Sequence, residues 1–319
     1  MGSAENVSAP AVWLIAGPTA SGKSALAVKL VQALDGVVIN ADASQLYADL
    51  SVLTARPTPA DLQQAPHRLY GVADGGDAWS VGRWLRAVLP LLADARREGR
   101  CALVTGGTGL YFNALTRGLA EAPDVPADVR LAVQARYEQD GEAAFRAMLR
   151  GLDPAAEGRI APRDRQRLVR ALAVAEATGR AMTDWQADTR PALAPGQWRG
   201  VVLDPPREAL YARCDARVEQ MLREGALDEV ARLAARGLDP GLPVMKALGY
   251  RWLAAHLDGA ISREQAIAAT AQDTRRYAKR QMTWFRNQAA DWARIDGLDP
   301  DHQAAQLFAL AGRAGDRTP

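Results

Sequence analysis

The chain has 319 residues, of which 48% are hydrophobic, and a formal net charge of +2. That length suffices for an α/β core with an inserted or appended domain. No stretch approaches the roughly twenty apolar residues of a membrane helix, two cysteines are too few for a disulfide framework or zinc cluster, and the small net charge excludes a globally basic nucleic-acid binder. We expect a cytoplasmic protein that needs no membrane and no obligate protein partner, and for which a monomer suffices.

A glycine-rich turn follows the first apolar run, residues 12–16, and opens a predicted helix. The turn reads Gly17, Pro18, Thr19, Ala20, Ser21, Gly22, Lys23 and Ser24. Such a turn between a strand and a helix aims backbone N–H groups and the positive end of the helix dipole at one point, which suits a polyphosphate. Lys23 would add a mobile cation, and Ser24 a hydroxyl ligand for Mg²⁺.

Residue usage supports this interpretation of the turn. The chain has only four lysines (Lys23, Lys29, Lys246 and Lys279) against 35 arginines, which is 39 basic residues minus 4. A lysine at this place therefore indicates a need for a compact ammonium group. With only three histidines in the chain, any metal is expected to be oxygen-ligated, and Mg²⁺ is the natural candidate beside a phosphate loop.

The residues that follow predict an alternation of helices and strands. The first helix reaches about Leu34, with Gly36 as its C-terminal cap. A short strand at 37–39 leads to Asp42, a helix starts near Val81, and a strand at 101–104 leads into a second glycine-rich turn at 106–109. Alternating elements predict a parallel sheet with helices on both sides, and the loops at the carboxyl ends of its strands should face one crevice. That crevice is the candidate active site.

The character of the chain changes between residues 121 and 198. Six prolines punctuate segments with helical spacing, and nothing there is typical of a buried strand. Apolar residues 201–203 then resume the sheet. We therefore predict an α/β fold, a P-loop-type parallel sheet flanked by helices with an inserted all-helical domain. Residues 1–120 and 199–319 form the core and its C-terminal helices, and 121–198 form the insertion.

A predicted helix over 207–224 raises a question about two side chains. Asp204 precedes it and is compatible either with a metal-binding aspartate after a strand or with an N-cap. The apolar stripe of the helix runs through Leu210, Cys214, Met221 and Leu222, with Arg217 among them. An inward guanidinium needs a counter-charge, which a bound phosphate or an internal carboxylate could supply.

Two segments concentrate positive charge. Residues 159–170 hold five arginines, and residues 275–286 hold four arginines and a lysine interleaved with three aromatic side chains. This pattern is compatible with nucleic-acid binding and equally with solvated helix faces. A capping box, Ser262 to Gln265, predicts the start of the second, long basic helix.

Six motifs taken together resemble the bacterial tRNA dimethylallyltransferase family over about residues 11–290. They are GPTASGKS from Gly17, ADASQLY around Asp42, VTGGTGLY from Val104, DRQRLVRAL from Asp164, ALGYR from Ala247 and AKRQMTWFR from Ala278. The resemblance implies transfer of a dimethylallyl group from its diphosphate to N6 of the adenosine just 3′ of the anticodon, with release of diphosphate. Its implied partners are the tRNA anticodon stem-loop, dimethylallyl diphosphate and Mg²⁺.

The resemblance also implies residue roles. Asp42 is the general base toward the adenine amine. The turn from Gly17 to Ser24 binds diphosphate, and Thr19, Lys23, Arg217 and a Mg²⁺ held by Ser24 stabilise the charge on the leaving group. In this interpretation the loop binds a leaving group and does not hydrolyse ATP.

The RNA contacts implied by the resemblance are spread over the chain. They are Asp42, Ala43, Ser44, Gln45, Thr108, Gln166, Arg167, Leu168, Val169, Arg170, Lys246, Ala247, Leu248, Gly249, Tyr250, Arg251 and Arg280. The chain departs from the family pattern where Ala43, and not a serine, follows Asp42, so a hydroxyl contact there is not implied. The target adenine must swing out of its stack, so an unpaired loop is the expected substrate.

Two other functions fit parts of the pattern. A small-molecule or nucleotide kinase would use the same turn for ATP and Asp42 to deprotonate a hydroxyl acceptor. An RNA-binding switch protein would sense a nucleotide without group transfer. The basic helix with its aromatic residues and the arginine-rich insertion weigh against the kinase, and Asp42 beside the phosphates weighs against the switch.

Overall fold

The structure, a computed structural model, describes residues 12–120 and 122–315. Residues 1–11, 121 and 316–319, which fall within the expected domain ranges, lie outside the described residues. The chain divides into two compact units, one formed by residues up to 113 together with those from 193 onward, and one by residues 114–192.

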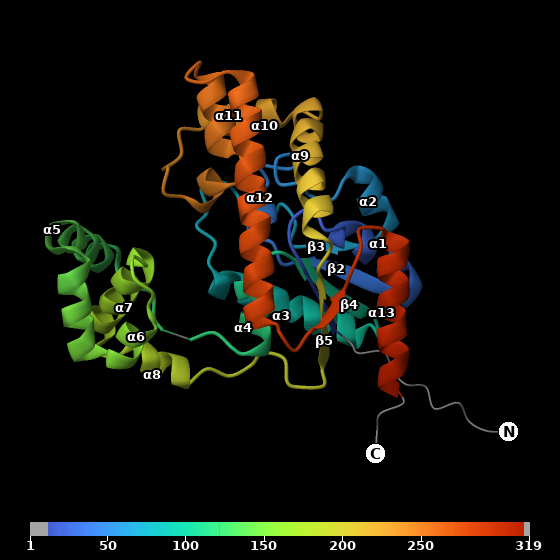
Figure 1. Ribbon diagram of the computed structural model, residues 1–319. Coiled ribbons are helices and arrows are strands. Elements are labelled where there is room, and N and C mark those ends of the chain that lie inside the picture. Colours follow the sequence, from blue (N-terminus) through green and yellow to red (C-terminus); the bar gives the residue numbers. More distant parts are fainter. Residues whose placement is uncertain (1–11, 121, 316–319) are drawn as a thin grey trace. The chain divides into compact units, whose positions relative to one another are not determined.

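The first unit is built on a six-stranded sheet in the order β3-β2-β4-β1-β5-β6 (Figure 1). All neighbouring strands are parallel. The strands are β1 (Val12–Ala16), β2 (Gly36–Asn40), β3 (His67–Arg68), β4 (Cys101–Gly106), β5 (Trp198–Leu203) and β6 (Ala293–Ile295). The predicted α/β class with a parallel sheet is thereby confirmed, and β1 lies between the strands that carry the other site loops.

Helices accompany this sheet along the chain. They are α1 (Lys23–Leu34), α2 (Pro59–Gln64), α3 (Val81–Arg97), α4 (Gly109–Thr116), α9 (Arg207–Arg223), α10 (Ala226–Ala235), α11 (Tyr250–Leu257), α12 (Arg263–Gln288) and α13 (Pro300–Gly315), with short 3₁₀ helices at Ser44–Leu46 and Pro243–Lys246. The capping box predicted at the start of α12 is present, with Ser262 and Gln265 bonding reciprocally.

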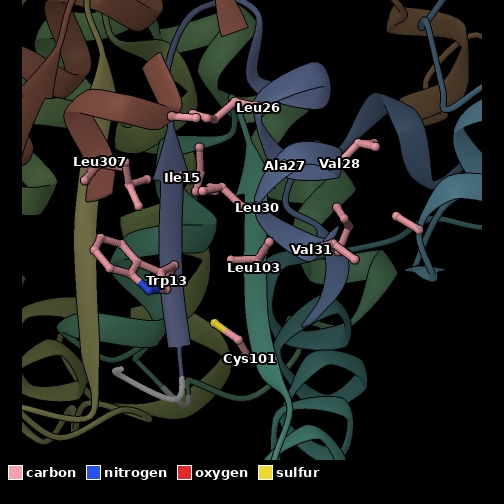
Figure 2. Close-up of a cluster of buried hydrophobic side chains, with 14 of the residues drawn as sticks. Trp13, Ile15, Leu26, Ala27, Val28, Leu30, Val31, Cys101, Leu103 and Leu307 are labelled. Atoms are coloured by element: carbon pink, nitrogen blue, oxygen red, sulfur yellow. The ribbon is translucent and has the colours of Figure 1, made fainter. Parts of the chain in front are cut away.

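A hydrophobic core joins the central strands to α1 and α13 (Figure 2). Trp13 and Ile15 of β1 and Leu103 of β4 contribute from the sheet, and Leu26 and Leu307 contribute from the helices. Burying a leucine completely stabilises a fold by about 1.5–3 kcal/mol. This packing fixes β1 against α1 and so anchors both ends of the glycine-rich turn.

Two details of the predicted helices are wrong. The left-handed residue that ends α1 is Asp35, with φ 45°, whereas Gly36 is the first residue of β2. A carboxamide or carboxylate side chain tolerates this conformation better than most. In α9 the buried apolar residues are Leu210, Cys214 and Val218. The buried stripe therefore continues from Cys214 to Val218 and does not include Met221 and Leu222.

The second unit contains helices α5 to α8 and, among its described residues, no strand. They are α5 (Ala127–Leu152), α6 (Pro154–Arg159), α7 (Arg165–Thr178) and α8 (Met182–Ala187). Phe145 and Leu149 of α5 pack against Leu168 and Leu172 of α7 in a core of the unit's own. Among the described residues, no helix is both long enough and apolar enough to cross a membrane.

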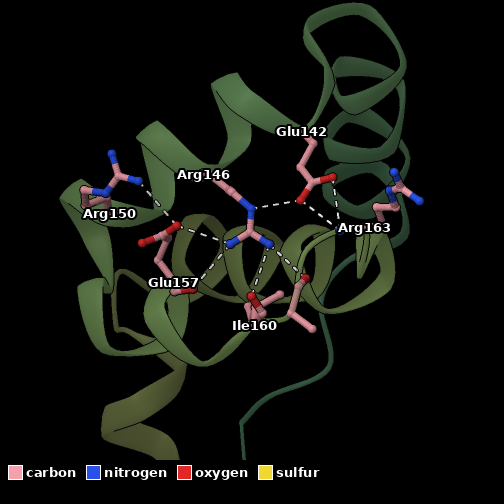
Figure 3. A network of polar contacts seen from close by, with 7 residues as sticks. Glu142, Arg146, Arg150, Glu157, Ile160 and Arg163 are labelled. Carbon is pink, nitrogen blue, oxygen red and sulfur yellow. Dashed lines mark hydrogen bonds and ion pairs between the residues drawn. The ribbon is translucent and has the colours of Figure 1, made fainter.

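Arg146 organises the polar side of this helical unit (Figure 3). Its guanidinium donates to Glu142 at 2.8 Å, to Glu157 at 3.2 Å and to the carbonyl oxygens of Ile160 and Ala161 at 3.1 and 2.8 Å. Glu142 in turn accepts the backbone N–H of Arg163. One side chain thus fixes the turn that leads into α7.

We expect Arg146→Met to lower the midpoint of thermal unfolding and to accelerate amide exchange at 160–164, because two carboxylates and three carbonyl groups lose their common donor. Arg150→Met is the matched control, since Glu157 is the one polar partner of Arg150 among the described residues and the Arg150 side chain is 64% exposed. Equal effects of the two substitutions on the melting curve and on exchange would contradict this assignment.

Candidate active site

A cavity of about 270 Å³ lies at the carboxyl ends of the central strands. It is lined by Thr19, Ala20, Ser21, Gly22, Lys23, Ser24, Ala25, Asp42, Ser44, Gln45, Leu53, Thr54, Tyr70, Thr105, Gly106, Arg213, Cys214, Arg217, Val218, Met221, Leu248, Thr270, Thr274 and Tyr277. The turn after β1, the segment after β2, and helices α9 and α12 therefore meet at one place. The cavity combines cations, one carboxylate and an apolar wall.

The glycine-rich turn has the geometry of an anion-binding loop. Gly22, with φ 96°, ends the turn, and no side chain caps the first turn of α1. The N–H groups at that helix end are consequently available to an anion. Gly17 leaves little room for a side chain, because a Cβ there would lie 3.0 Å from Cβ of Leu203. Gly17 and Pro18 support the turn without lining the cavity.

Lys23 lies within the turn that it is expected to serve. Its Nζ donates to the carbonyl oxygen of Pro18 at 2.6 Å. Burial lowers the pKa of Lys23 to about 8, the Asp42 charge opposes this change, and the Arg217 charge adds to it. An anion arriving between the two cations would favour the charged ammonium and raise that pKa again.

Arg217 enters the cavity from α9 without a carboxylate partner. Among the described residues, no carboxylate oxygen lies within ion-pair distance of its guanidinium, and Asp42 acts on it only at longer range. Burial lowers the pKa of Arg217. The internal ion pair left open by the sequence is therefore absent there, and a bound anion remains the available counter-charge.

Asp204 fits neither of its predicted roles. It does not line the cavity, and the N-cap of α9 is Pro206. The backbone N–H of Asp204 instead donates to the carbonyl oxygen of Ile295 at 2.8 Å, continuing the pairing of β5 with β6.

Asp42 is held by its neighbours with one carboxylate oxygen left over. Asn40 clamps its backbone, accepting the Asp42 N–H at 2.7 Å and donating to its carbonyl oxygen at 2.9 Å. Oδ1 of Asp42 accepts both the backbone N–H and the hydroxyl of Ser44, at 3.1 and 2.6 Å. Within the described chain, Oδ2 has no hydrogen-bond partner, so it can accept a proton from a substrate.

Some residues near Asp42 line the cavity, and others hold its backbone segment in place. Ser44 and Gln45 line the cavity, whereas Ala43 and Thr108 do not. The Thr108 hydroxyl accepts the backbone N–H of Ala43 at 3.0 Å. Thr108 therefore ties the segment after β2 to the turn after β4.

Gln281 of α12 is a residue that the sequence reasoning missed. Its Oε1 accepts the backbone N–H of Thr19 at 2.8 Å, and its Nε2 donates to the carbonyl oxygen of Gly107 at 3.0 Å. The side chain is buried, and a Cβ on Gly107 would lie 2.1 Å from its Nε2. Gln281 thus connects the phosphate turn, the turn after β4 and the basic helix. The only sequence signal was its place in the AKRQMTWFR motif.

A second buried glutamine supports the turn from the other side. Gln303 of α13 donates from Nε2 to the carbonyl oxygens of Ser21 and Gly297, at 2.9 and 3.0 Å. Nothing in the local sequence pattern distinguishes this glutamine from a solvated helix residue. Its partners become visible only when α13 packs on α1.

The expected RNA contacts in the sheet unit surround the cavity or carry exposed charge. Leu248 lines the cavity, and Gly249, with φ 89°, is the N-cap of α11. Tyr250 is buried, and Arg251 pairs with Asp273 at 2.6 Å. Lys246 and Arg280 are exposed, and Ala247 is half-buried.

The remaining expected contacts lie on α7 of the helical unit. Gln166, Arg167 and Arg170 are exposed, whereas the side chains of Leu168 and Val169 belong to the unit's core. The exposed three are the ones available to a partner.

Comparisons with known proteins place the chain in a family. The IPP transferase family model matches residues 45–288, and an isopentenyl transferase model matches residues 10–75. A tRNA dimethylallyltransferase of Phenylobacterium zucineum is 58% identical over 300 residues, which cover 94% of this chain and 97% of that protein. One from a Caulobacter species is 58% identical over 289 residues, covering 91% and 94%.

Solved structures agree with this assignment. The full-length tRNA isopentenylpyrophosphate transferase of Bacillus halodurans is similar with a TM-score of 0.70 and 32% identity, over 96% of this chain and 97% of that one. A eukaryotic dimethylallyltransferase acting on tRNA is similar with a TM-score of 0.82 and 25% identity, over 96% of this chain and 80% of that one. The chain therefore belongs to the IPP transferase family, in company with the tRNA dimethylallyltransferases.

Proposed function

We propose that the protein transfers a dimethylallyl group from dimethylallyl diphosphate to N6 of the adenosine just 3′ of the anticodon in tRNA, releasing diphosphate. The observation that carries this proposal is one cavity in which a phosphate turn, three cations (Lys23, Arg213 and Arg217), a carboxylate and an apolar wall meet. Leu53, Val218, Met221 and Leu248 offer the apolar surface that a five-carbon chain needs.

The cations stabilise the leaving group. Lys23, Arg217 and the uncapped N–H groups of α1 face the place where negative charge develops as the C–O bond breaks. The Thr19 side chain also lines this place, although its backbone N–H is already bonded to Gln281. Thr19 therefore acts through its hydroxyl and through the shape of the turn.

Asp42 acts on the adenine amine, which accepts the prenyl group. The lone pair of an aromatic amine is delocalised into its ring, so removing a proton as the C–N bond forms raises the amine's nucleophilicity. Oδ2 of Asp42 takes that proton, because Oδ1 is already occupied by Ser44. The balance is one C–O bond broken, one C–N bond formed and one proton moved to the carboxylate.

Mg²⁺ fits this site only as a cation shared with the substrate. Among the described residues, no group of three or more His, Cys, Asp or Glu side chains could hold a metal ion. The exposed hydroxyl of Ser24 lines the cavity and would supply one oxygen, leaving the others to diphosphate and water, as Mg²⁺ prefers. When bound, the ion supplies further neutralisation of diphosphate charge.

The tRNA is recognised as an unpaired anticodon loop. Exposed arginines on α7 and the exposed face of α12 around Arg280 contribute positive charge in different parts of the chain, and the target base leaves its stack to reach Asp42. Action in the cytoplasm, where tRNA is found, and action as a monomer are further parts of the proposal.

The kinase alternative is disfavoured by the relatives and by the cavity. Both family models and the similar structures are isopentenyl or dimethylallyl transferases. A hydroxyl acceptor for phosphoryl transfer also has no need of the apolar side chains that line the cavity.

The direct test mixes the protein with unmodified tRNA, Mg²⁺ and either dimethylallyl diphosphate or ATP. We expect mass spectrometry to show that the anticodon-loop fragment gains one five-carbon unit in the reaction with dimethylallyl diphosphate and not in the reaction with ATP. Asp42→Asn keeps an acceptor for Ser44 and should lower the transfer rate by about 10²–10⁴ while tRNA remains bound. ATP turnover without transfer would favour the kinase, and tRNA binding without either reaction would favour the switch protein.

The pKa of Lys23 makes donor binding dependent on pH. Because its pKa in the ligand-free protein is about 8, the ammonium is lost as the pH rises through that value, and an anion restores it. We expect affinity for dimethylallyl diphosphate without tRNA to fall between pH 8 and about 9.5, with proton uptake on binding. Calorimetry in two buffers of different ionisation enthalpy measures the affinity and the proton uptake. Lys23→Met should abolish the proton uptake. Uptake that persists in this variant would assign the proton to another group.

Gln281→Leu tests the connection between the phosphate turn and α12. It leaves the Thr19 N–H and the Gly107 carbonyl without partners, each costing about 1–3 kcal/mol. We expect kcat/KM for dimethylallyl diphosphate to fall by about 10–100-fold with tRNA affinity nearly unchanged. The control is Gln272→Leu, the same change at an exposed position of α12. Equal kinetics for the two variants would disprove the connection.

A further inference from the structure

Glu229 of α10 is a buried carboxylate bound by backbone amides. It is 6% exposed. Its oxygens accept the N–H of Ser51 at 2.9 Å, the N–H of Val52 at 2.9 Å to each oxygen, and the N–H of Leu53 at 3.0 Å. No lysine or arginine forms an ion pair with it among the described residues. Three successive amides therefore satisfy a buried negative charge, which is a strong and directional arrangement.

The amides belong to a tight turn that these bonds hold in shape. Within it the N–H of Ala55 donates to the carbonyl oxygen of Val52, and the N–H of Arg56 to that of Ser51, both at 2.9 Å. Ala55 has a φ of 48°, in the left-handed region that most residues avoid. The carboxylate of Glu229 compensates for that conformation by fixing the three amides that precede it.

The turn presents two carbonyl groups to Gln45. Nε2 of Gln45 donates to the carbonyl oxygens of Thr54 and Ala55, at 2.9 and 2.8 Å. Both amide hydrogens are thereby used, and the amide cannot flip without losing both bonds. Oε1 is the atom of Gln45 left to accept a hydrogen bond. Gln45 lines the same cavity as Asp42, as do Leu53 and Thr54 of the turn.

We propose that Glu229 is a positioning residue for RNA recognition, which fixes the turn at 51–55 and through it holds Gln45 with Oε1 as an acceptor for a donor group of the RNA. The inference rests on the proposed function in taking RNA as the substrate, and it adds a residue outside the cavity to the recognition site. Glu229 touches neither cavity nor substrate; it acts through Gln45.

Arg236, the C-cap at the other end of the same helix, provides a control. It pairs with Asp49 and with Asp74, which are neighbours of the turn in sequence or space. It makes no hydrogen bond to the amides of 51–53. Arg236→Gln therefore loosens the attachment of α10 without releasing the turn.

The experiment measures the affinity of an unmodified anticodon stem-loop RNA for variants of the full chain, beside amide exchange at 51–53. Glu229→Gln puts a donor where an acceptor is needed, and we expect faster exchange and about tenfold weaker RNA binding. In a Gln45→Ala background the same substitution should weaken binding less than about twofold. Glu229→Asp keeps the charge and should recover part of the affinity, whereas Arg236→Gln should change RNA binding less than twofold.

Several results would overturn the inference. They are an equal loss from Glu229→Gln with and without Gln45, an equal loss from Arg236→Gln, or faster exchange with unchanged RNA affinity. If Glu229→Gln does not fold, the comparison of Glu229→Asp in the two backgrounds decides by the same criterion. If the native protein binds the stem-loop but transfers no prenyl group, the proposed function is refuted, and the effect of the Glu229 and Gln45 variants on RNA affinity can still be measured. If the native protein binds no RNA, the proposed function and this inference are both refuted.

Discussion

The bonds of one buried amide hold the active-site loops together. Gln281 accepts from the turn that follows β1 and donates to the turn that follows β4, and it does so from a helix formed more than 150 residues later in the chain. A glutamine suits this place because it offers one acceptor and two donors at the end of a flexible stem. Burial makes each bond expensive to lose, so the two turns and α12 have one preferred arrangement.

Charge distribution within the cavity follows from that arrangement. Lys23 and Arg217 are brought near each other without a paired carboxylate, and Asp42 is the acid that influences both. Two partly desolvated cations in the absence of a counter-ion carry an electrostatic cost. This cost falls at the place where we propose that a diphosphate binds, and it would favour a multiply charged anion over a neutral group there.

Local sequence patterns predicted the parts of the fold that are set by neighbouring residues. The strand, turn and helix around Lys23, the buried strand before Asp42 and the capping box at Ser262 all follow from spacing within a few residues. The ends of elements were less predictable, since Asp35 and not Gly36 takes the left-handed position that ends α1. The sequence also could not separate the buried side chains of α7, Leu168 and Val169, from the exposed ones in a contiguous motif.

The supporting residues of the site could not be predicted, because their partners are backbone groups far away in sequence. Gln281, Gln303 and Glu229 each bond to at least one amide or carbonyl that is 174 to 282 residues distant. Backbone N–H and C=O groups occur at nearly every position, so the residue type at the partner position does not reveal the bond. Only the path of the folded chain selects which of them meet.

The contact of Gly107 and Gly109 with α12 limits how this loop can vary. A Cβ at Gly107 would collide with Gln281, and one at Gly109 would lie 2.3 Å from the Trp284 ring. The permitted side chains of the loop are consequently decided by a helix encoded near the other end of the chain. A side chain introduced at either glycine would therefore need a compensating change on α12, so an engineered loop and the facing part of the helix are best exchanged together.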